Sequence, residues 1–133
     1  MSKAPVAAVI GHPVNHSRSP RMHNYWLAQF GLEGYYIPLD IDPKKFERSI
    51  RNLPELGFVG ANITIPYKEK VLKIADKISD RAALVGAANT LTFLQNGGIY
   101  ADNTDGYGFL QNIKSKYKDW SASEGISVVF GAG

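Results

Sequence analysis

The sequence contains no cysteine, and this absence excludes several kinds of chemistry at once. Without thiols the chain can have no disulfide framework, no thiolate metal site and no cysteine nucleophile. Long apolar runs are also absent, since none approaches the roughly 18–20 residues that a membrane-spanning helix needs. Basic charge is not clustered: 15 Lys and Arg residues stand against 12 Asp and Glu residues, which gives a net charge of +3. We therefore expect neither a membrane nor a nucleic acid as partner.

Two further signals are missing. The first residues lack the basic-then-apolar pattern of a secretion signal, and we therefore expect a cytoplasmic protein. The three histidines, His12, His16 and His23, do not have the spacing of a zinc site, because Pro13 breaks any helical pairing between the first two. The acidic loop over 102–108 lacks the length and the terminal glutamate of a calcium-binding EF-hand. We expect no metal.

What the sequence does have is an alternation of apolar strands and amphipathic helices over 133 residues, of which 44% are hydrophobic. The pattern predicts strands over 6–10, 35–41, 58–65, 90–94, 99–101 and 126–130. It predicts helices over 20–30, 43–53, 67–78, 80–85 and 106–120. Such an alternation is typical of an α/β fold, a mostly parallel twisted sheet with helices on both faces. The hairpin signal Gln95-Asn96-Gly97-Gly98 predicts that one strand runs antiparallel.

Helix starts and apolar faces follow from the same pattern. Ser19 and Asp42 each precede a proline and are expected to cap helices. Three apolar faces are expected to be buried, each on one of the predicted helices: Met22, Trp26 and Phe30; Phe46, Ile50 and Leu53; Phe109 and Ile113.

The last residues predict the beginning of a second domain. A buried strand over 126–130 leads into Gly131-Ala132-Gly133, as at the start of a dinucleotide-binding unit. Gly131 and Gly133 would let backbone amides approach a pyrophosphate. We expect residues 1–120 to form one domain, 121–133 to be a linker and the first strand of a truncated Rossmann domain, and the chain to be a fragment of a longer protein.

Two polar clusters stand near expected strand ends, where α/β sheets bind ligands. Ser17 and Ser19 alternate in a loop and could both face a carboxylate or a polyol, although Ser19 could equally be only a helix cap. Asn62 and Thr64 lie two apart and so share one face of a strand. Lys68 falls in the expected first helical turn, where the helix dipole opposes its charge. The alternative to a role in chemistry is that Lys68 is an ordinary solvated lysine on the surface.

Two further clusters complete the set. Asn89 follows three small residues and either orients one hydrogen bond to a ligand or is a plain turn residue. Asp105 precedes a helix, so it is either a cap or the carboxylate partner of Lys68. A lysine held by a carboxylate suits general acid–base work on a hydroxyl group.

These clusters together resemble the shikimate dehydrogenase family. Ser17-Arg18-Ser19-Pro20 resembles its S-x-S-P loop, and residues 62–68, NITIPYK, resemble its N-[VI]-T-x-P-x-K segment. Ala88-Asn89-Thr90 is similar to its A-N-T motif, and Asn103-Thr104-Asp105-Gly106 to its N-T-D-G motif. The resemblance runs from about Val6 to the last glycine, in matching order and spacing.

The resemblance implies an NADP-dependent enzyme that interconverts 3-dehydroshikimate and shikimate, of which this chain would be the substrate-binding domain, inactive alone. It implies Lys68 and Asp105 as the catalytic pair. It implies substrate contacts from Ser17, Ser19, Asn62, Thr64, Lys68, Asn89 and Asp105. A homodimer is a possible assembly. Two alternatives stay open, a quinate/shikimate dehydrogenase and a non-catalytic shikimate-binding module.

Overall fold

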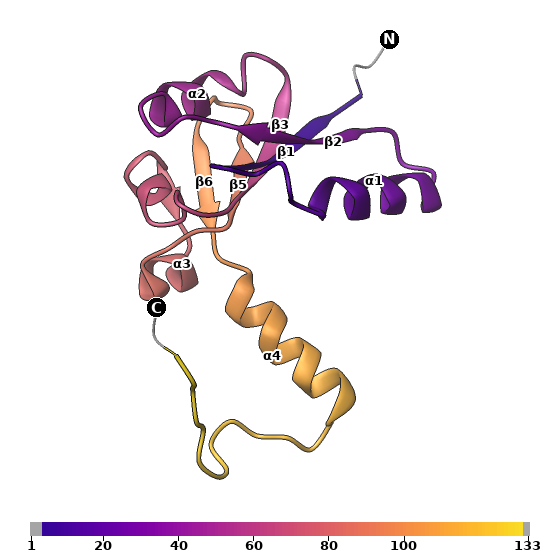
Figure 1. Ribbon diagram of the computed structural model, residues 1–133, viewed down its shortest axis with the longest axis vertical. Coiled ribbons are helices and arrows are strands. Elements are labelled where there is room, and N and C mark those ends of the chain that lie inside the picture. The colour runs from indigo at the N-terminus through magenta and orange to yellow at the C-terminus, as the bar shows by residue number, and fades with distance from the viewer. Residues whose placement is uncertain (1–3, 132–133) are drawn as a thin grey trace.

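The computed structural model describes residues 4–131 and shows a single six-stranded sheet with short helices on its two faces (Figure 1). The strand order is β2-β1-β3-β5-β6-β4. The strands are β1 (Val6–Gly11), β2 (Tyr35–Asp40), β3 (Phe58–Ile63), β4 (Lys77–Ile78), β5 (Thr90–Phe93) and β6 (Ile99–Asp102). The helices are α1 (Ser19–Gln29), α2 (Phe46–Asn52), the 3-10 turn η1 (Lys70–Lys73), α3 (Asp80–Val85) and α4 (Asp105–Lys116).

The predicted fold class is confirmed. Strand β1 pairs in parallel with both β2 and β3, and β4 pairs in parallel with β6. Strand β5 is antiparallel to β3 and β6, so it is the expected reversed strand. In this register Asn62, Thr90 and Asp102 lie side by side on three neighbouring strands. The ends of these strands therefore meet at one edge of the sheet.

The main core lies on the face of the sheet that α2, η1 and α3 cover. Ala8 and Ile10 alternate along β1 toward this face, as the two-residue period of a strand requires. Phe46 and Ile50 of α2 pack there, and so does Leu53 just after the helix, which confirms the predicted apolar face. The core as a whole comprises Ala8, Ile10, Phe46, Ile50, Leu53, Ala61, Ile63, Tyr67, Val71, Ile74, Ala82, Ala88, Leu91, Ile99 and Ala101.

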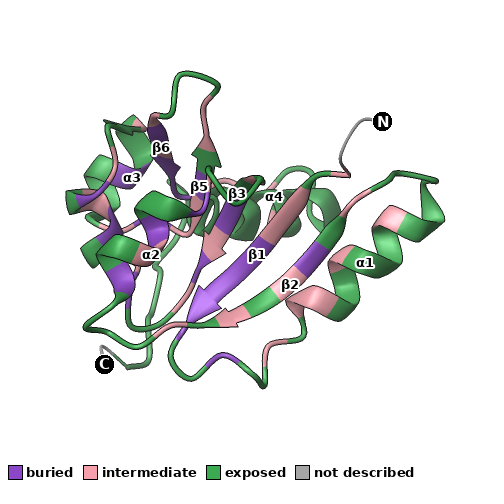
Figure 2. Cartoon of the chain, turned by 90° about the horizontal axis from the view of Figure 1, so that it is seen from above, coloured by how far each residue is buried: buried purple, intermediate pink, exposed green. Residues whose placement is uncertain are grey.

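The opposite face is covered by α1, which contacts β2 and β1 (Figure 2). The expected burial of Met22, Trp26 and Phe30 is wrong, because all three are exposed. Helix α1 instead turns His23 and Leu27, one position further along, toward the sheet. The step of four residues identified an apolar face of this helix, but it was not the face that meets the sheet.

The helix predicted over 67–78 is also wrong. Its apolar positions Tyr67, Val71 and Ile74 are buried, but only the single turn η1 is helical. The chain then leaves the helical path to pair with β6. There the backbone N–H of Asp76 donates to the Ile99 carbonyl, and the Asp76 carboxylate accepts from the Ile99 N–H at 2.8 Å. Pairing with an open strand edge satisfies the backbone groups that a longer helix would otherwise have used.

Three smaller expectations differ from the structure. Ser19 is inside α1 rather than its cap, and its N–H donates to Ser17 Oγ. Asp42 caps a turn ahead of α2, since the helix begins only at Phe46. Phe109 is exposed, because α4 extends away from the sheet and none of its residues is buried (Figure 1).

The apolar run over 126–130 is not a buried strand. Ile126, Val128, Val129 and Phe130 are exposed, and this stretch pairs with none of the six strands. A strand forms only beside a partner that accepts its backbone hydrogen bonds, and the part of the chain that is described offers none here. Gly131 is described, with φ of 97°, whereas Gly133 lies outside the described residues.

Candidate functional site

A polar cavity of about 400 Å³ opens where the ends of β1, β3 and β6 meet the start of β5. Its walls are the loop after β1, the segment after β3 and the two turns beside β5 and β6. The residues predicted to bind substrate all line it: Ser17, Ser19, Asn62, Thr64, Lys68, Asn89 and Asp105. The sheet topology has thus brought together four clusters that are far apart in the sequence.

Lys68 and Asp105 form an ion pair inside this cavity, with 2.5 Å between Lys68 Nζ and Asp105 Oδ2. The other carboxylate oxygen accepts a hydrogen bond of 2.7 Å from Asn89 Nδ2. Asp105 is the first residue of α4 rather than a cap, and a negative charge in the first turn suits the helix dipole. Lys68 is therefore not a plain solvated lysine.

The backbone around Lys68 explains how the lysine is held. Lys68 and Glu69 form a turn directly before η1, so the expected place in a first helical turn is wrong. The carbonyl oxygen of Lys68 accepts from the Ala88 N–H at 2.8 Å. This bond ties the lysine to the segment that carries Asn89, and so fixes the distance between two of the clusters.

Asn89 connects the remaining clusters. Its Oδ1 accepts from the Thr104 backbone N–H at 3.0 Å, so its Nδ2 must face Asp105. Its backbone carbonyl accepts from the Ile63 N–H at 2.8 Å, and its N–H donates to the Asp102 carbonyl. A turn residue without a role would not need this many partners. Asn89 sets the position of Asp105 relative to β3.

The serine loop is anchored by residues that the sequence did not indicate. Asp40 at the end of β2 bonds to His12 Nδ1 at 2.6 Å and accepts from the Val14 N–H at 3.2 Å. The hydrogen bond from His12 lowers the pKa of Asp40 below its ordinary value. Residue Ser17 then folds back, its N–H donating to the Val14 carbonyl. Both serines of the loop line the cavity.

A second anchor lies behind Asp105. Asp102 is buried and accepts from Ser79 Oγ at 2.6 Å, from the Asn103 N–H at 2.8 Å and from both the Nε and Nη2 of Arg81. The Arg81 guanidinium holds the pKa of Asp102 far below its ordinary value. This network joins the start of α3 to the end of β6, directly ahead of Asp105. Nothing in the sequence pattern pairs residues 81 and 102.

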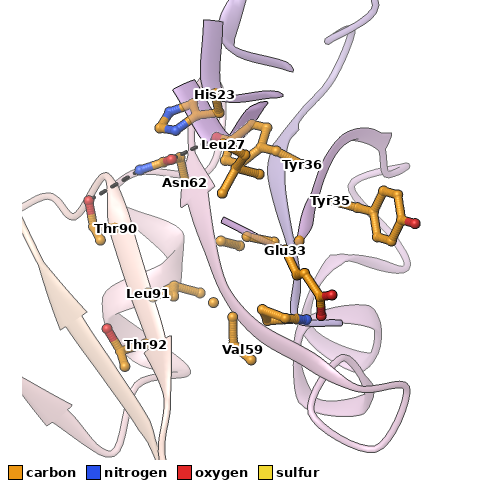
Figure 3. A pocket seen from close by; sticks show the side chains of 15 residues that line it. His23, Leu27, Glu33, Tyr35, Tyr36, Val59, Asn62, Thr90, Leu91 and Thr92 are labelled. Atoms are coloured by element: carbon orange, nitrogen blue, oxygen red, sulfur yellow. Dashed lines mark hydrogen bonds between the residues drawn. The ribbon is translucent and has the colours of Figure 1, made fainter. Parts of the chain in front are cut away.

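A second cavity of about 370 Å³ lies on the α1 side of the sheet, lined mostly by apolar side chains such as Leu27, Val59 and Leu91 (Figure 3). It shares His23 and Asn62 with the polar cavity. The Tyr36 hydroxyl donates to Asn62 Oδ1 at 2.6 Å across this region. Tyr36 was also missed by the sequence analysis, because it lies inside an apolar strand.

Gly131, which was expected to bind a dinucleotide, lines neither cavity. The stretch over 126–131 has irregular, exposed backbone, so the described residues do not form the strand-turn cradle that a dinucleotide needs. The polar cavity that contains Lys68 and Asp105 supports a narrower chemistry than dinucleotide binding. It can bind a small anionic polyol through hydroxyl, amide and ammonium groups, and its lysine–carboxylate pair can exchange a proton with a ligand oxygen.

The sequence family described as "Shikimate dehydrogenase substrate binding domain" matches residues 9–91. A shikimate dehydrogenase (NADP(+)) of Roseobacter denitrificans is 54% identical over 133 residues, which is 100% of this chain and 48% of that protein. One from a Jannaschia species is 56% identical over 97% of this chain and 46% of its own length. This chain therefore spans about half the length of the curated relatives that it matches.

Two solved structures of shikimate dehydrogenases also superpose on this chain. The shikimate 5-dehydrogenase of Thermus thermophilus in complex with shikimate superposes with a TM-score of 0.79 at 38% identity, over 84% of this chain and 42% of that one. The enzyme of Listeria monocytogenes in complex with shikimate and NAD gives a TM-score of 0.82 at 30% identity, over 88% of this chain and 40% of that one.

Proposed function

This chain belongs to the family of shikimate dehydrogenase substrate-binding domains, and from that premise we propose that it is the substrate-binding half of an NADP-dependent shikimate dehydrogenase. The reaction would be the reversible reduction of 3-dehydroshikimate to shikimate. The observation that carries this proposal is the Lys68–Asp105 ion pair, braced by Asn89 inside a cavity that all seven expected binding residues line.

In this proposal each residue has a distinct role. Ser17 and Ser19 bind the carboxylate of shikimate, because hydroxyl donors next to a helix start suit an anion. Asn62, Thr64, Asn89 and Asp105 surround the ring hydroxyls. The cofactor, when bound, would supply the hydride to the carbonyl carbon. Lys68 gives the proton to the ketone oxygen, and takes it back in the reverse direction. Asp105 holds the lysine in place for this exchange.

NADP belongs to the proposal because the relatives carry it in their name. The described residues do not by themselves form a dinucleotide site, since 126–131 forms no strand beside the sheet. We therefore place most of the cofactor's binding site on the half of the relatives' length that this chain does not span. In this division, residues 1–120 are the substrate-binding domain and 121–133 lead toward the cofactor domain. Gly131 and Gly133 remain candidates for contacts with NADP.

The test is a chimera in which this chain replaces the matching half of the Roseobacter denitrificans relative. We expect NADP-dependent oxidation of shikimate by the chimera and no turnover by the 133-residue chain alone. Quinate serves as the comparison substrate. Turnover of quinate as fast as shikimate would favour the quinate/shikimate dehydrogenase, and binding without turnover would favour the non-catalytic module.

The cellular location and the oligomeric state complete the proposal. No helix within residues 4–131 is long and apolar enough to cross a membrane. We propose that the protein works in the cytoplasm, and cell fractionation tests this. We also propose a homodimer, because Tyr25 and Trp26 of α1 and Phe30 just after it are exposed. A mass of one chain by light scattering, at concentrations up to the limit of solubility, would count against the dimer.

A further inference from the structure

Tyr36, on the edge strand β2, makes contacts with Asn24, His23 and Asn62. Its backbone is clamped by Asn24 of α1, whose Nδ2 donates to the Tyr36 carbonyl at 2.7 Å and whose Oδ1 accepts from the Tyr36 N–H at 3.0 Å. The His23 ring stacks on its ring with 4.1 Å between centroids. The third contact is the hydroxyl, which reaches across β1 to Asn62 (Figure 3).

The neighbours of Asn62 fix which way its amide points. The Asn89 carbonyl can only accept, so the Asn62 atom that faces it at 3.2 Å must be Nδ2. Thr90 Oγ1 donates its proton to Asn89 Oδ1 at 2.8 Å, so toward Asn62 Nδ2 at 3.3 Å it accepts. Asn62 Oδ1 therefore faces Tyr36, whose hydroxyl must donate.

This arrangement leaves the Asn62 side chain able to accept a further hydrogen bond from a ligand. Both of its N–H groups point to acceptors within the protein, and one acceptor position of Oδ1 is taken by Tyr36. Within residues 4–131, no donor besides Tyr36 bonds to Oδ1, so its second acceptor position remains, and Asn62 lines the polar cavity. Burial raises the pKa of Tyr36 to about 12, so the hydroxyl keeps its proton near neutral pH.

We propose that Tyr36 is a positioning residue which holds the Asn62 carbonyl oxygen as a hydrogen-bond acceptor for a ring hydroxyl of the substrate. Tyr36 does not itself line the polar cavity, so it acts through Asn62. The substrate class rests on the proposed function. The orientation of the amide does not, because it follows from the fixed donors and acceptors around it.

The effect should concentrate on binding rather than on proton transfer. Hydrogen bonds continue from Asn62 through Thr90 and Asn89 to Asp105, but Asn89 is also held independently by the Thr104 backbone N–H. Loss of the Tyr36 hydroxyl therefore removes one of the three hydrogen bonds that hold the Asn62 side chain, the one on its Oδ1, and leaves the Lys68–Asp105 pair in place. The expected signature is a raised KM for shikimate with an unchanged kcat and an unchanged pH profile.

The test is Tyr36→Phe in the chimera described above, with Tyr35→Phe as the matched control on the same strand, where the tyrosine is exposed. Phenylalanine keeps the ring that stacks on His23 and removes only the hydroxyl. We expect KM for shikimate to rise about fivefold, as for the loss of one neutral hydrogen bond, with kcat changed less than about twofold. In an Asn62→Ala background, Tyr36→Phe should change nothing further.

An equal effect of Tyr36→Phe with and without Asn62 would overturn the proposal, and so would an unchanged KM. Nuclear magnetic resonance of the 133-residue chain gives a readout that does not depend on turnover. Tyr36→Phe should shift the side-chain amide signals of Asn62 and speed their exchange with solvent, whereas Tyr35→Phe should not. If the chimera proves inactive, these signals still decide: unchanged Asn62 signals reject the positioning role, and changed ones support it while the proposed function fails.

Discussion

At the scale of single residues, the lysine–carboxylate pair is defined by where its other hydrogen bonds go. One carboxylate oxygen of Asp105 accepts from Lys68 and the other accepts from Asn89, so the carboxylate is held in one orientation. The Lys68 ammonium has three donors and uses one of them on Asp105. A donor therefore remains for a ligand oxygen in the cavity that Lys68 lines. Under the proposed function, this donor would deliver the proton to the ketone oxygen.

Lys68→Ala in the chimera tests this role. We expect kcat for shikimate oxidation to fall by roughly 10²–10⁴-fold, the range that a positioned acid or base contributes. The KM for shikimate should change much less, because the six other side chains predicted to bind substrate still line the cavity. Lys73→Ala is the matched control, since this lysine is exposed in η1 and does not line the cavity. A kcat within a few-fold of the unchanged chimera would contradict the role given to Lys68.

At this scale of single residues, most of the candidate site could be predicted from the sequence. Residues such as Ser17, Asn62 and Lys68 stand in polar clusters that interrupt apolar segments, and a polar residue where an apolar one is expected is visible in the sequence. Tyr36 gave no such signal, because tyrosine is common in strands and its hydroxyl partner is 26 residues away. Contacts between distant residues were predicted only where one chemistry linked them, as for the lysine and its carboxylate.

At the scale of elements, the junction between α3 and β6 carries a charge network that supports the site. Asp102 is buried at the end of β6 and collects donors from Ser79, Arg81 and Asn103. A buried carboxylate with this many donors is stabilised in its charged form, and removing the charge leaves those donors poorly paired. The junction therefore holds the segment that begins with Asn103 and carries Asp105.

Asp102→Asn should lower the stability of the fold in a pH-dependent way. Arg81 keeps the pKa of Asp102 below its ordinary value of 3.8, so the carboxylate contributes stability above about pH 4 and loses it as the pH falls further. The difference in unfolding free energy between the unchanged chain and Asp102→Asn should therefore be full near pH 7 and shrink below pH 4. Urea unfolding followed by circular dichroism at several pH values measures it.

The control for this series is Asp119→Asn, which removes an exposed carboxylate outside the network. It should leave both the unfolding free energy and its pH dependence nearly unchanged. A difference between Asp102→Asn and the unchanged chain that stays constant from pH 7 to pH 3 would show that the charge of Asp102 does not stabilise the fold.

Helices and strands were predicted well where a single apolar face determines the element, and poorly where backbone pairing with another strand determines it. The period of α2 is unambiguous, and Phe46 and Ile50 are buried as expected. Along 67–78 the period of the apolar residues was also right, but strand β4 took residues 77–78 because β6 offered an edge. Such an edge is not visible in local sequence, since it depends on which strands become neighbours.

At the scale of the whole molecule, the sheet topology places the site at one edge. Strands β1 and β3 are parallel and both end there, while the reversal of β5 brings Thr90 and Asn89 to the same edge. The path from β6 into α4 then delivers Asp105. All seven side chains expected to bind substrate are supplied by residues 17–105, within the part of the chain that the structure describes.

This completeness predicts that the 133-residue chain binds shikimate without a cofactor, which calorimetric titration measures. Heat is expected with shikimate and a weaker signal with quinate, whose extra hydroxyl needs a partner in a cavity where the side-chain N–H groups of Asn62 and Asn89 already donate to acceptors within the protein. Ser17→Ala should weaken shikimate binding by removing a hydroxyl from the cavity wall, whereas Ser123→Ala, an exposed serine far along the chain, should not. No heat with either ligand would mean that this edge of the sheet does not bind on its own, because elements from outside residues 4–131 are needed to close the cavity over the ligand.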